Sequence, residues 1–200
     1  LLIRAIVTDA AGHTTNDIVW TYGAGGQLEQ MKLTTYTATG YEVKTQDAKG
    51  TLRQHDIYYG GGWNGAPVTF HSQAVYDASG KLIQINVFDA LDRVTLEFFV
   101  DPATGTAVKR IQYAYHSASP MSVERIDTYL GPSWKVAQQD FYGLSGQLTQ
   151  QKFYDAATGA NTERREYFYD AAGDLMRTDI YRQNAPHVVG GTLYLVKTLW

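Results

Sequence analysis

The sequence predicts an all-β fold, an antiparallel meander of many short hairpin repeats that forms an extended or curved sheet. Three observations support this prediction. One turn phrase recurs along the chain, the segments between turns are rich in Thr, Val, Ile, Tyr and Phe, and no segment carries a helical apolar stripe over three turns. A β-sandwich or a barrel is the alternative arrangement of the same strands.

The turn phrase is clearest at residues 169–175, which read Tyr, Asp, Ala, Ala, Gly, Asp, Leu. Residues 76–82 repeat it, and residues 22–28 and 142–148 carry Gly in the Asp position. We expect the Asp side chain to accept hydrogen bonds from nearby backbone amides, and Gly to supply a positive φ. Because Leu then begins the next strand, the phrase predicts the connection of a β-hairpin.

Turns of this composition follow one another at steps of mostly about 12 to 15 residues, which is the mark of a repeat architecture. One step holds one bend and one strand of ordinary length. Strands joined by such short bends must run antiparallel. We therefore expect roughly a dozen or more strands, with clear examples at residues 82–88, 94–100, 108–115, 148–154 and 175–181.

Most of these strands have no clean apolar face. Residues 175–181 place polar side chains between apolar ones on both faces, and residues 148–154 do so on one face, unlike a sheet with one buried face. This pattern favours a thin, extended sheet or an open curved shell. The one clean alternation, where we expect the densest core, is Val94, Leu96, Phe98 and Val100.

Composition and charge exclude several classes. The net charge of -3 without a basic cluster argues against a nucleic-acid partner, and no run is long and apolar enough to span a membrane. Cys is absent, so disulfides and thiolate metal sites are excluded. The chain begins with Leu and shows no signal peptide, so we expect a fragment or mature piece of a longer protein.

We expect a single β-repeat domain over residues 1–200. One stretch interrupts the rhythm, because three consecutive glycines, Gly60 to Gly62, precede Trp63 and Asn64. It predicts a long loop that carries a large aromatic side chain, and loops on a rigid sheet often carry function. The same stretch equally allows a joint between two halves of the chain at residues 60–67.

The phrase Tyr-Asp-x-x-Gly-x-Leu, matched at residues 76–82 and 169–175, resembles the YD repeats of the RHS family of bacterial secreted and cell-surface proteins. Residues 154–159 match it with one insertion. The resemblance implies β-hairpin sheets that wrap into shells or stalks and that present or enclose other modules. It implies no catalytic residues.

Aromatic side chains are the strongest candidates for a binding site. The chain has 15 Tyr and 4 Trp, and a flat ring beside amides and hydroxyls suits a sugar, whose C–H groups pack on the ring while its hydroxyls form hydrogen bonds. Cross-strand aromatic ladders that stiffen the sheet are the alternative interpretation. The candidate carbohydrate-binding residues are Trp63, Asn64, Tyr58 and Tyr59 at the glycine loop, and Trp134 and Tyr129 around residues 131–132.

The recurring aspartates have two interpretations. Stacked turns could together bind Ca²⁺, which needs six to eight oxygen ligands. Capping of each turn by its own Asp is the simpler interpretation, and we expect no other cofactor. The residues concerned are Asp9, Asp47, Asp77, Asp89, Asp101, Asp155 and Asp170.

The sequence holds no nucleophile, phosphate-loop or metalloprotease motif. The one acid and histidine cluster is Asp56, His55 and His71. We therefore expect a non-catalytic β-repeat module of a larger bacterial extracellular protein, secreted or at the cell surface, that binds polysaccharide or a cell-surface glycan and contacts neighbouring domains of its own chain. A structural spacer or shell repeat of a surface adhesin or toxin is the alternative, and a polysaccharide-active enzyme is the third hypothesis.

Overall fold

The computed structural model describes residues 1–62, 67–183 and 193–199. These residues form strands joined by turns and bends, with no helix in the described ranges. They divide into two compact units, Leu1–Thr106 and Ala107–Trp200. The all-β prediction is therefore confirmed.

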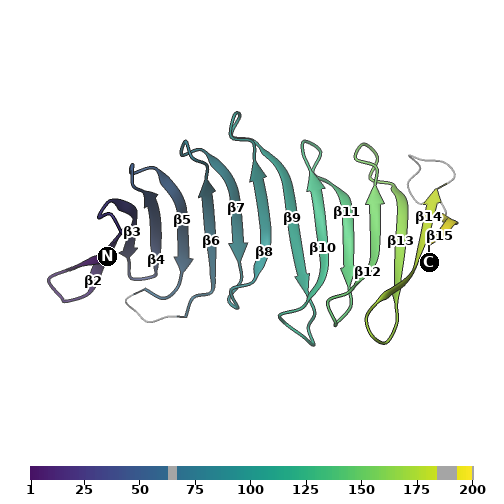
Figure 1. Cartoon of the computed structure of the whole chain (residues 1–200), viewed down its shortest axis with the longest axis horizontal. Coiled ribbons are helices and arrows are strands. Elements are labelled where there is room, and N and C mark those ends of the chain that lie inside the picture. Colours follow the sequence, from purple (N-terminus) through teal and green to yellow (C-terminus); the bar gives the residue numbers. More distant parts are fainter. Residues whose placement is uncertain (63–66, 184–192, 200) are drawn as a thin grey trace. The chain divides into compact units, whose positions relative to one another are not determined.

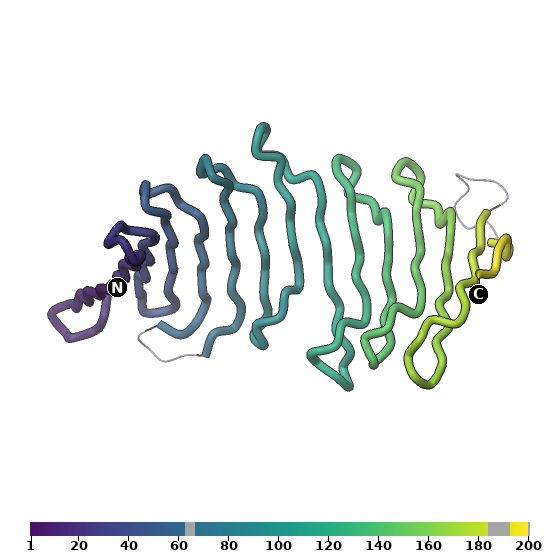
Figure 2. The backbone as a smooth tube through the Cα atoms, in the orientation of Figure 1, coloured from purple at the N-terminus to yellow at the C-terminus, as the bar shows by residue number. Residues whose placement is uncertain are grey.

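The first unit is a meander in which each strand pairs antiparallel with its neighbours in sequence (Figure 1). Figure 2 shows the same back-and-forth path of its backbone. Its strands are β1 (Leu2–Thr8), β2 (Thr14–Tyr22), β3 (Leu28–Tyr36), β4 (Gly40–Asp47), β5 (Leu52–Tyr59), β6 (Phe70–Tyr76), β7 (Leu82–Phe88) and β8 (Val94–Val100).

The second unit repeats this arrangement with the same antiparallel pairing of sequence neighbours (Figure 1). Its strands are β9 (Ala107–Tyr115), β10 (Val123–Leu130), β11 (Lys135–Tyr142), β12 (Leu148–Tyr154), β13 (Asn161–Tyr169), β14 (Leu175–Gln183) and β15 (Leu193–Leu199).

Each unit is a single layer. Within a unit, the described strands contact only their neighbours in sequence, apart from a minor contact between β13 and β15. Among the described strands of each unit, no second sheet covers either face, and the first and last strands do not pair. The predicted antiparallel meander is thus confirmed, and neither the sandwich nor the barrel describes the two units.

The recurring turn has the hydrogen bonds that its sequence predicts. Asp77 Oδ1 accepts from the backbone amides of Ser79 at 2.8 Å and Lys81 at 3.0 Å. Gly80 has a φ of 81°, in the left-handed region, and its amide donates to the Asp77 carbonyl at 3.1 Å. The same pair of side-chain bonds recurs at Asp9, Asp47, Asp89 and Asp170.

Each unit has little apolar core, because neither face of its sheet has a covering layer among the described strands. The buried apolar residues among those described are Val43, Val100, Ala160 and Ile180. The prediction of a dense core along β8 is wrong. Only Val100 is buried among the four alternating apolar residues of this strand. Val94, Leu96 and Phe98 stay partly exposed, because a single layer leaves their face of the sheet uncovered.

Stacked rings replace a core on one face of the first unit. Tyr41 and Tyr58 stack at 4.3 Å between ring centroids, Tyr58 and His71 at 4.6 Å, and His71 and Phe88 at 4.0 Å. Tyr36 extends the row, tilted at 5.7 Å from Tyr41. The rings lie on β3 to β7 and are direct partners in the strand register. We call this row the aromatic ladder, and it fits the second interpretation of the tyrosines.

An amide ladder runs beside the aromatic ladder on the same face. Asp56 accepts from Gln54 Nε2 at 2.7 Å and from Gln73 Nε2 at 3.0 Å. Asn86 donates to Gln73 Oε1 at 2.9 Å, and Gln84 donates to Asn86 Oδ1 at 2.7 Å. These bonds explain how the polar side chains of Asp56 and Asn86 are buried without the cost of an unpaired group.

The joint expected at residues 60–67 lies partly outside the described residues, because 63–66 are not among them. On its two sides, β5 and β6 pair continuously from Gln54 and Val75 to Tyr59 and Phe70. The joint stays a prediction.

Candidate functional site

A groove of about 390 Å³ in the second unit brings two predicted binding residues together. It lies where the β10–β11 and β12–β13 connections meet, at one end of the strands, the upper edge in Figure 1. We call it the Trp134 groove. It is lined by Tyr129, Trp134, Lys135, Val136, Gln139, Tyr154 and Gly159.

The backbone of the β10–β11 turn positions Trp134. Its amide donates to the Leu130 carbonyl at 3.1 Å, and the Gly131 amide donates to the Val108 carbonyl on β9 at 2.9 Å. Trp134 has a φ of 52°, which is uncommon for a bulky residue and is held only where surrounding contacts impose it. The turn is therefore fixed at both ends, and the indole is presented from a defined backbone.

Side chains of the same turn reach the next hairpin. Ser133 Oγ donates to the Ala156 carbonyl at 3.4 Å, and Lys135 Nζ donates to the Ala157 carbonyl. Gly159 borders the aliphatic part of Lys135, because a Cβ at Gly159 would lie 3.7 Å from Lys135 Cδ. These contacts join the two turns into one wall of the groove.

A chain of polar side chains lies beneath the groove. Tyr154 Oη donates to Gln139 Oε1 at 2.5 Å, and Gln139 Nε2 donates to the buried Asp127 at 2.9 Å. Arg125 pairs with Asp127 at 3.0 Å. Burial, and then the charge of Asp127, raises the pKa of Tyr154, so its hydroxyl is a neutral donor near neutral pH.

Tyr129 forms another part of the lining of the groove. Its register partners are Arg110 on β9 and Val136 on β11. The guanidinium carbon of Arg110 lies 3.8 Å from the ring centroid of Tyr129, a cation–π distance. The groove thus combines aromatic, amide, phenol and cationic groups.

The sequence indicated Tyr129 and Trp134 but missed Lys135, Gln139 and Tyr154. Their place follows from cross-strand register, which brings Gln139 beside Asp127 and Lys152. The one available signal was that Tyr154 precedes an Asp turn, which places it at a strand end.

The other predicted platform is only partly described. Trp63 and Asn64 lie outside the described residues. Tyr58 is stacked between Tyr41 and His71, so both faces of its ring are covered. Tyr59 points to the other side of β5, stacks on Phe70 at 4.2 Å and is 45% exposed.

A shallow hollow of about 220 Å³ adjoins Tyr59. Gly40 is its floor, and any side chain there would collide with the Tyr58 carbonyl, because a Cβ would lie 2.3 Å from that oxygen. Glu42 and Ile57 line the same hollow. The exposed surface of its lining is more apolar than that of the Trp134 groove.

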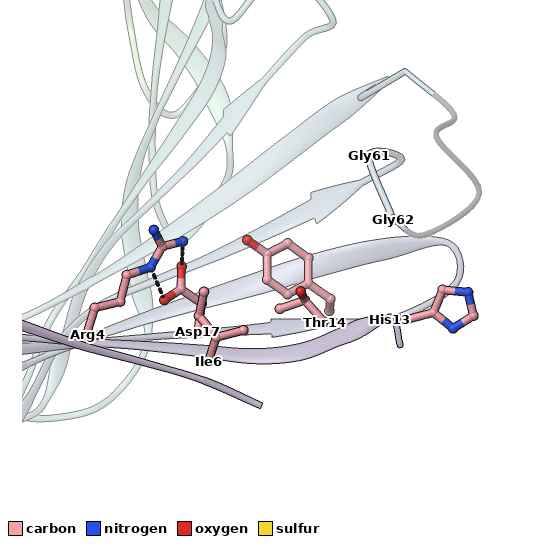
Figure 3. A pocket seen from close by; sticks show the side chains of 8 residues that line it. Arg4, Ile6, His13, Thr14, Asp17, Gly61 and Gly62 are labelled. Atoms are coloured by element: carbon pink, nitrogen blue, oxygen red, sulfur yellow. Dashed lines mark hydrogen bonds and ion pairs between the residues drawn. The ribbon is translucent and has the colours of Figure 1, made fainter. Parts of the chain in front are cut away.

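A third hollow, of about 390 Å³, lies near the N-terminus (Figure 3). Arg4 donates two hydrogen bonds of 2.8 Å to Asp17, and these bonds lower the pKa of that carboxyl. Figure 3 shows His13 pointing away from this pair, with Gly61 and Gly62 on the adjacent loop. Because the Arg4 charge is neutralised within the pocket, the pocket offers no net charge to a ligand from this pair.

The acid and histidine residues near the glycine loop are not brought together. Asp56 bonds to glutamines, His55 contacts Glu42 at 2.8 Å, and His71 contacts Asp92 at 3.3 Å. Each histidine thus has its own carboxylate.

The turn aspartates use their carboxylates locally. Hydrogen bonds from the amide of Lys81 and the side chain of Ser79 lower the pKa of Asp77, which keeps it ionised as an acceptor. In the described ranges no three His, Asp or Glu residues gather in a group that could hold a metal ion. Calcium binding by these turns stays a prediction.

No protein-family model matches the sequence, and no curated protein is significantly similar to it. A porin-like protein from Bacteroides uniformis shares 12% identity at a TM-score of 0.32, over 98% of this chain and 87% of that one. A Bacteroides fragilis protein of unknown function shares 9% identity at a TM-score of 0.23, over 100% and 91%. The TcdB2-TccC3 structure shares 11% identity at 0.19, over 96% of this chain and 16% of that one. TM-scores this low assign neither a family nor a function.

Within the described ranges, the structure holds no helix with the length and apolar character that a membrane crossing requires.

Proposed function

We propose that the chain is a non-catalytic carbohydrate-binding module of a larger bacterial extracellular protein, and that the Trp134 groove is its binding site. The module would be secreted or displayed at the cell surface, with polysaccharide or a surface glycan as ligand and neighbouring domains of its own chain as further contacts. The YD-like turn phrase supports the proposal that the module belongs to a bacterial extracellular protein. The composition of the groove supports the ligand.

The observation that carries the proposal is the gathering of Tyr129, Trp134 and Tyr154 around Gln139 in one groove. Sugar C–H groups pack on aromatic faces, and sugar hydroxyls need both donors and acceptors. Gln139 keeps an amide hydrogen and a lone pair beyond its bonds to Asp127 and Tyr154. A concave site with rings and a few fixed polar groups is typical of small-ligand recognition.

Several other rings are already covered by neighbouring side chains. The aromatic ladder stacks its members on one another. In the second unit, cationic side chains lie over the rings of Phe141, Phe153, Phe168 and Tyr181. The Trp134 groove has a hollow beside its rings, so a ligand ring has room there.

Replacing Trp134 with Ala tests the site. We expect wild-type protein to bind one or more polysaccharides in affinity electrophoresis or calorimetry, and Trp134→Ala to weaken that binding at least about 30-fold, the effect of losing one dominant aromatic contact. Phe168→Ala is the matched control, because Phe168 is an aromatic residue of the same unit that lies outside the groove and has Arg177 over its ring. Equal weakening by both variants, or no effect of Trp134→Ala, would contradict the site.

The structural spacer or shell repeat is the second candidate. It is favoured by the aromatic ladder, which is a stiffening device rather than a display of free rings. A wild-type chain that binds no member of a broad polysaccharide panel would favour the spacer over the binding module.

A further inference from the structure

The arginines of the second unit follow a charge rule with one exception. In four cases an arginine has a carboxylate two positions away on its own strand, and Arg182 reaches Glu163 on the neighbouring strand at 2.6 Å. The four pairs are Arg125 with Asp127 at 3.0 Å, Arg164 with Glu166 at 3.2 Å, Arg165 with Glu163 at 2.7 Å, and Arg177 with Asp179 at 3.4 Å.

Arg110 is the exception. Val108 and Gln112 occupy the positions two residues away, and in the described part of the chain Arg110 forms no ion pair. Its Nε atom is buried and has no hydrogen-bond partner among the described residues, as is also true of Arg164, but Arg164 faces Glu166 at 3.2 Å. The guanidinium carbon of Arg110 instead lies over the ring of Tyr129, which lines the Trp134 groove.

The second cation of the groove also lacks a carboxylate partner. Lys135 Nζ bonds to the carbonyl of Ala157, not to an acid. The nearby acids are engaged elsewhere: Asp127 is held by Arg125 and Gln139 beneath the groove, and Asp155 Oδ1 accepts hydrogen bonds within its own turn. Lys135 therefore lines the groove and Arg110 adjoins it through Tyr129, and neither cation forms an ion pair among the described residues.

We infer that the groove binds acidic saccharides, with the carboxylate of a uronic-acid unit at Arg110; this inference rests on the proposed function. A guanidinium stacked on a ring keeps its N–H edge free and already oriented, and that edge matches the two oxygens of a carboxylate. A neutral sugar would leave the charge of Arg110 without a partner. Lys135 adds a second, less directional attraction for the carboxylate of the saccharide.

The test compares two forms of one polymer, polygalacturonate and its methyl ester. The ester keeps the sugar ring and the hydroxyls and removes the charge. Wild-type protein should bind the acid form about tenfold or more tightly than the ester, a difference that matches one charge-assisted hydrogen-bonded pair. Equal affinity for the two forms would overturn the inference.

Variants assign the effect to Arg110. Arg110→Gln should weaken binding of the acid form about tenfold and remove most of the difference in affinity between the acid form and the ester. Arg110→Lys should give an intermediate affinity, because it keeps the charge and loses the planar edge. Arg182→Gln removes the same charge outside the groove and should have little effect. Far-ultraviolet dichroism checks that each variant is folded.

The outcomes separate the two proposals. If both polymer forms bind equally and Trp134→Ala abolishes both, the acidic specificity fails and the carbohydrate site stands. If Arg110→Gln and Arg182→Gln weaken binding equally, the attraction is general and the role of Arg110 fails. If neither form nor any neutral polysaccharide binds, the proposed function fails together with the inference.

Discussion

Asp77 shows how one side chain closes a hairpin. Its carboxylate satisfies two amides of the turn, and the amide of Gly80 bonds to its carbonyl. Gly143 takes the Asp position in another copy of the turn, where its amide donates to the Gln147 carbonyl at 2.9 Å. The backbone of the turn therefore forms without the carboxylate, which adds stability rather than the fold itself.

Gly143→Asp should stabilise the protein by about 0.5–1 kcal/mol. The change removes freedom of the unfolded chain and adds the missing side-chain acceptor. A Cβ at this position meets nothing closer than 3.6 Å, so the residue fits. Urea unfolding of the variant and the wild type measures the difference.

Gly146→Asp in the same turn is the control. Gly146 has a φ of 81°, and any residue with a Cβ there should lower the free energy of unfolding by about 1–2 kcal/mol. Asp92 occupies the corresponding position of the β7–β8 turn with a φ of 61°, so Asp is tolerated there but strained. A Gly143→Asp variant less stable than wild type would refute the capping account.

For single residues, the sequence predicted the contacts that form within one turn. The turn phrase contains its own acceptor and its own glycine, so Asp77 and Gly80 could be interpreted without the fold. Arg110, Gln139 and Tyr154 could not, because their partners lie on neighbouring strands in a register that the sequence does not display. Trp134 and Tyr129 were found because they flank one turn.

Within one strand, neighbouring residues can have opposite roles. On β5, Tyr58 lies inside the aromatic ladder, whereas Tyr59 lies on the other side of the sheet and stacks on Phe70. Alternation along a strand predicts that the two rings face opposite ways. It does not predict which face stacks, because that depends on Tyr41 and His71 of the adjoining strands.

Tyr58→Ala should lower the free energy of unfolding by about 2 kcal/mol, because it removes a ring packed on both faces. Tyr59→Ala should cost about 1 kcal/mol or less, because its ring is packed on one face and exposed on the other. Urea unfolding of both variants provides the comparison. Equal costs would show that the aromatic ladder contributes no special stability.

At the scale of the whole molecule, each unit lacks a covering layer among its described strands, and this sets its energetics. Few apolar side chains are buried among the described residues, so most keep part of their surface in water. The sequence indicated such a thin sheet through strands without a clean apolar face. It misled at β8, where clean alternation suggested a core, because alternation shows that one face is apolar and not that anything covers it.

The division after Thr106 also could not be predicted. Residues 101–106 form a turn of the same composition as many others, with Asp101 and a Gly105 of positive φ. Compact units depend on which strands pack together in space, and no change in composition accompanies the boundary. The glycine-rich stretch at 60–62 attracted attention because its composition is unusual.

Because each described strand contacts almost exclusively its sequence neighbours, a local weakness should spread to near neighbours first. Hydrogen exchange with mass spectrometry can follow this in Tyr58→Ala. We expect protection to fall in β4, β5 and β6, less in β3 and β7, and not measurably in β10 to β14. A layered protein with one shared core would instead lose protection throughout, since every element depends on that core. Uniform loss of protection across the chain would therefore contradict a stability built strand by strand.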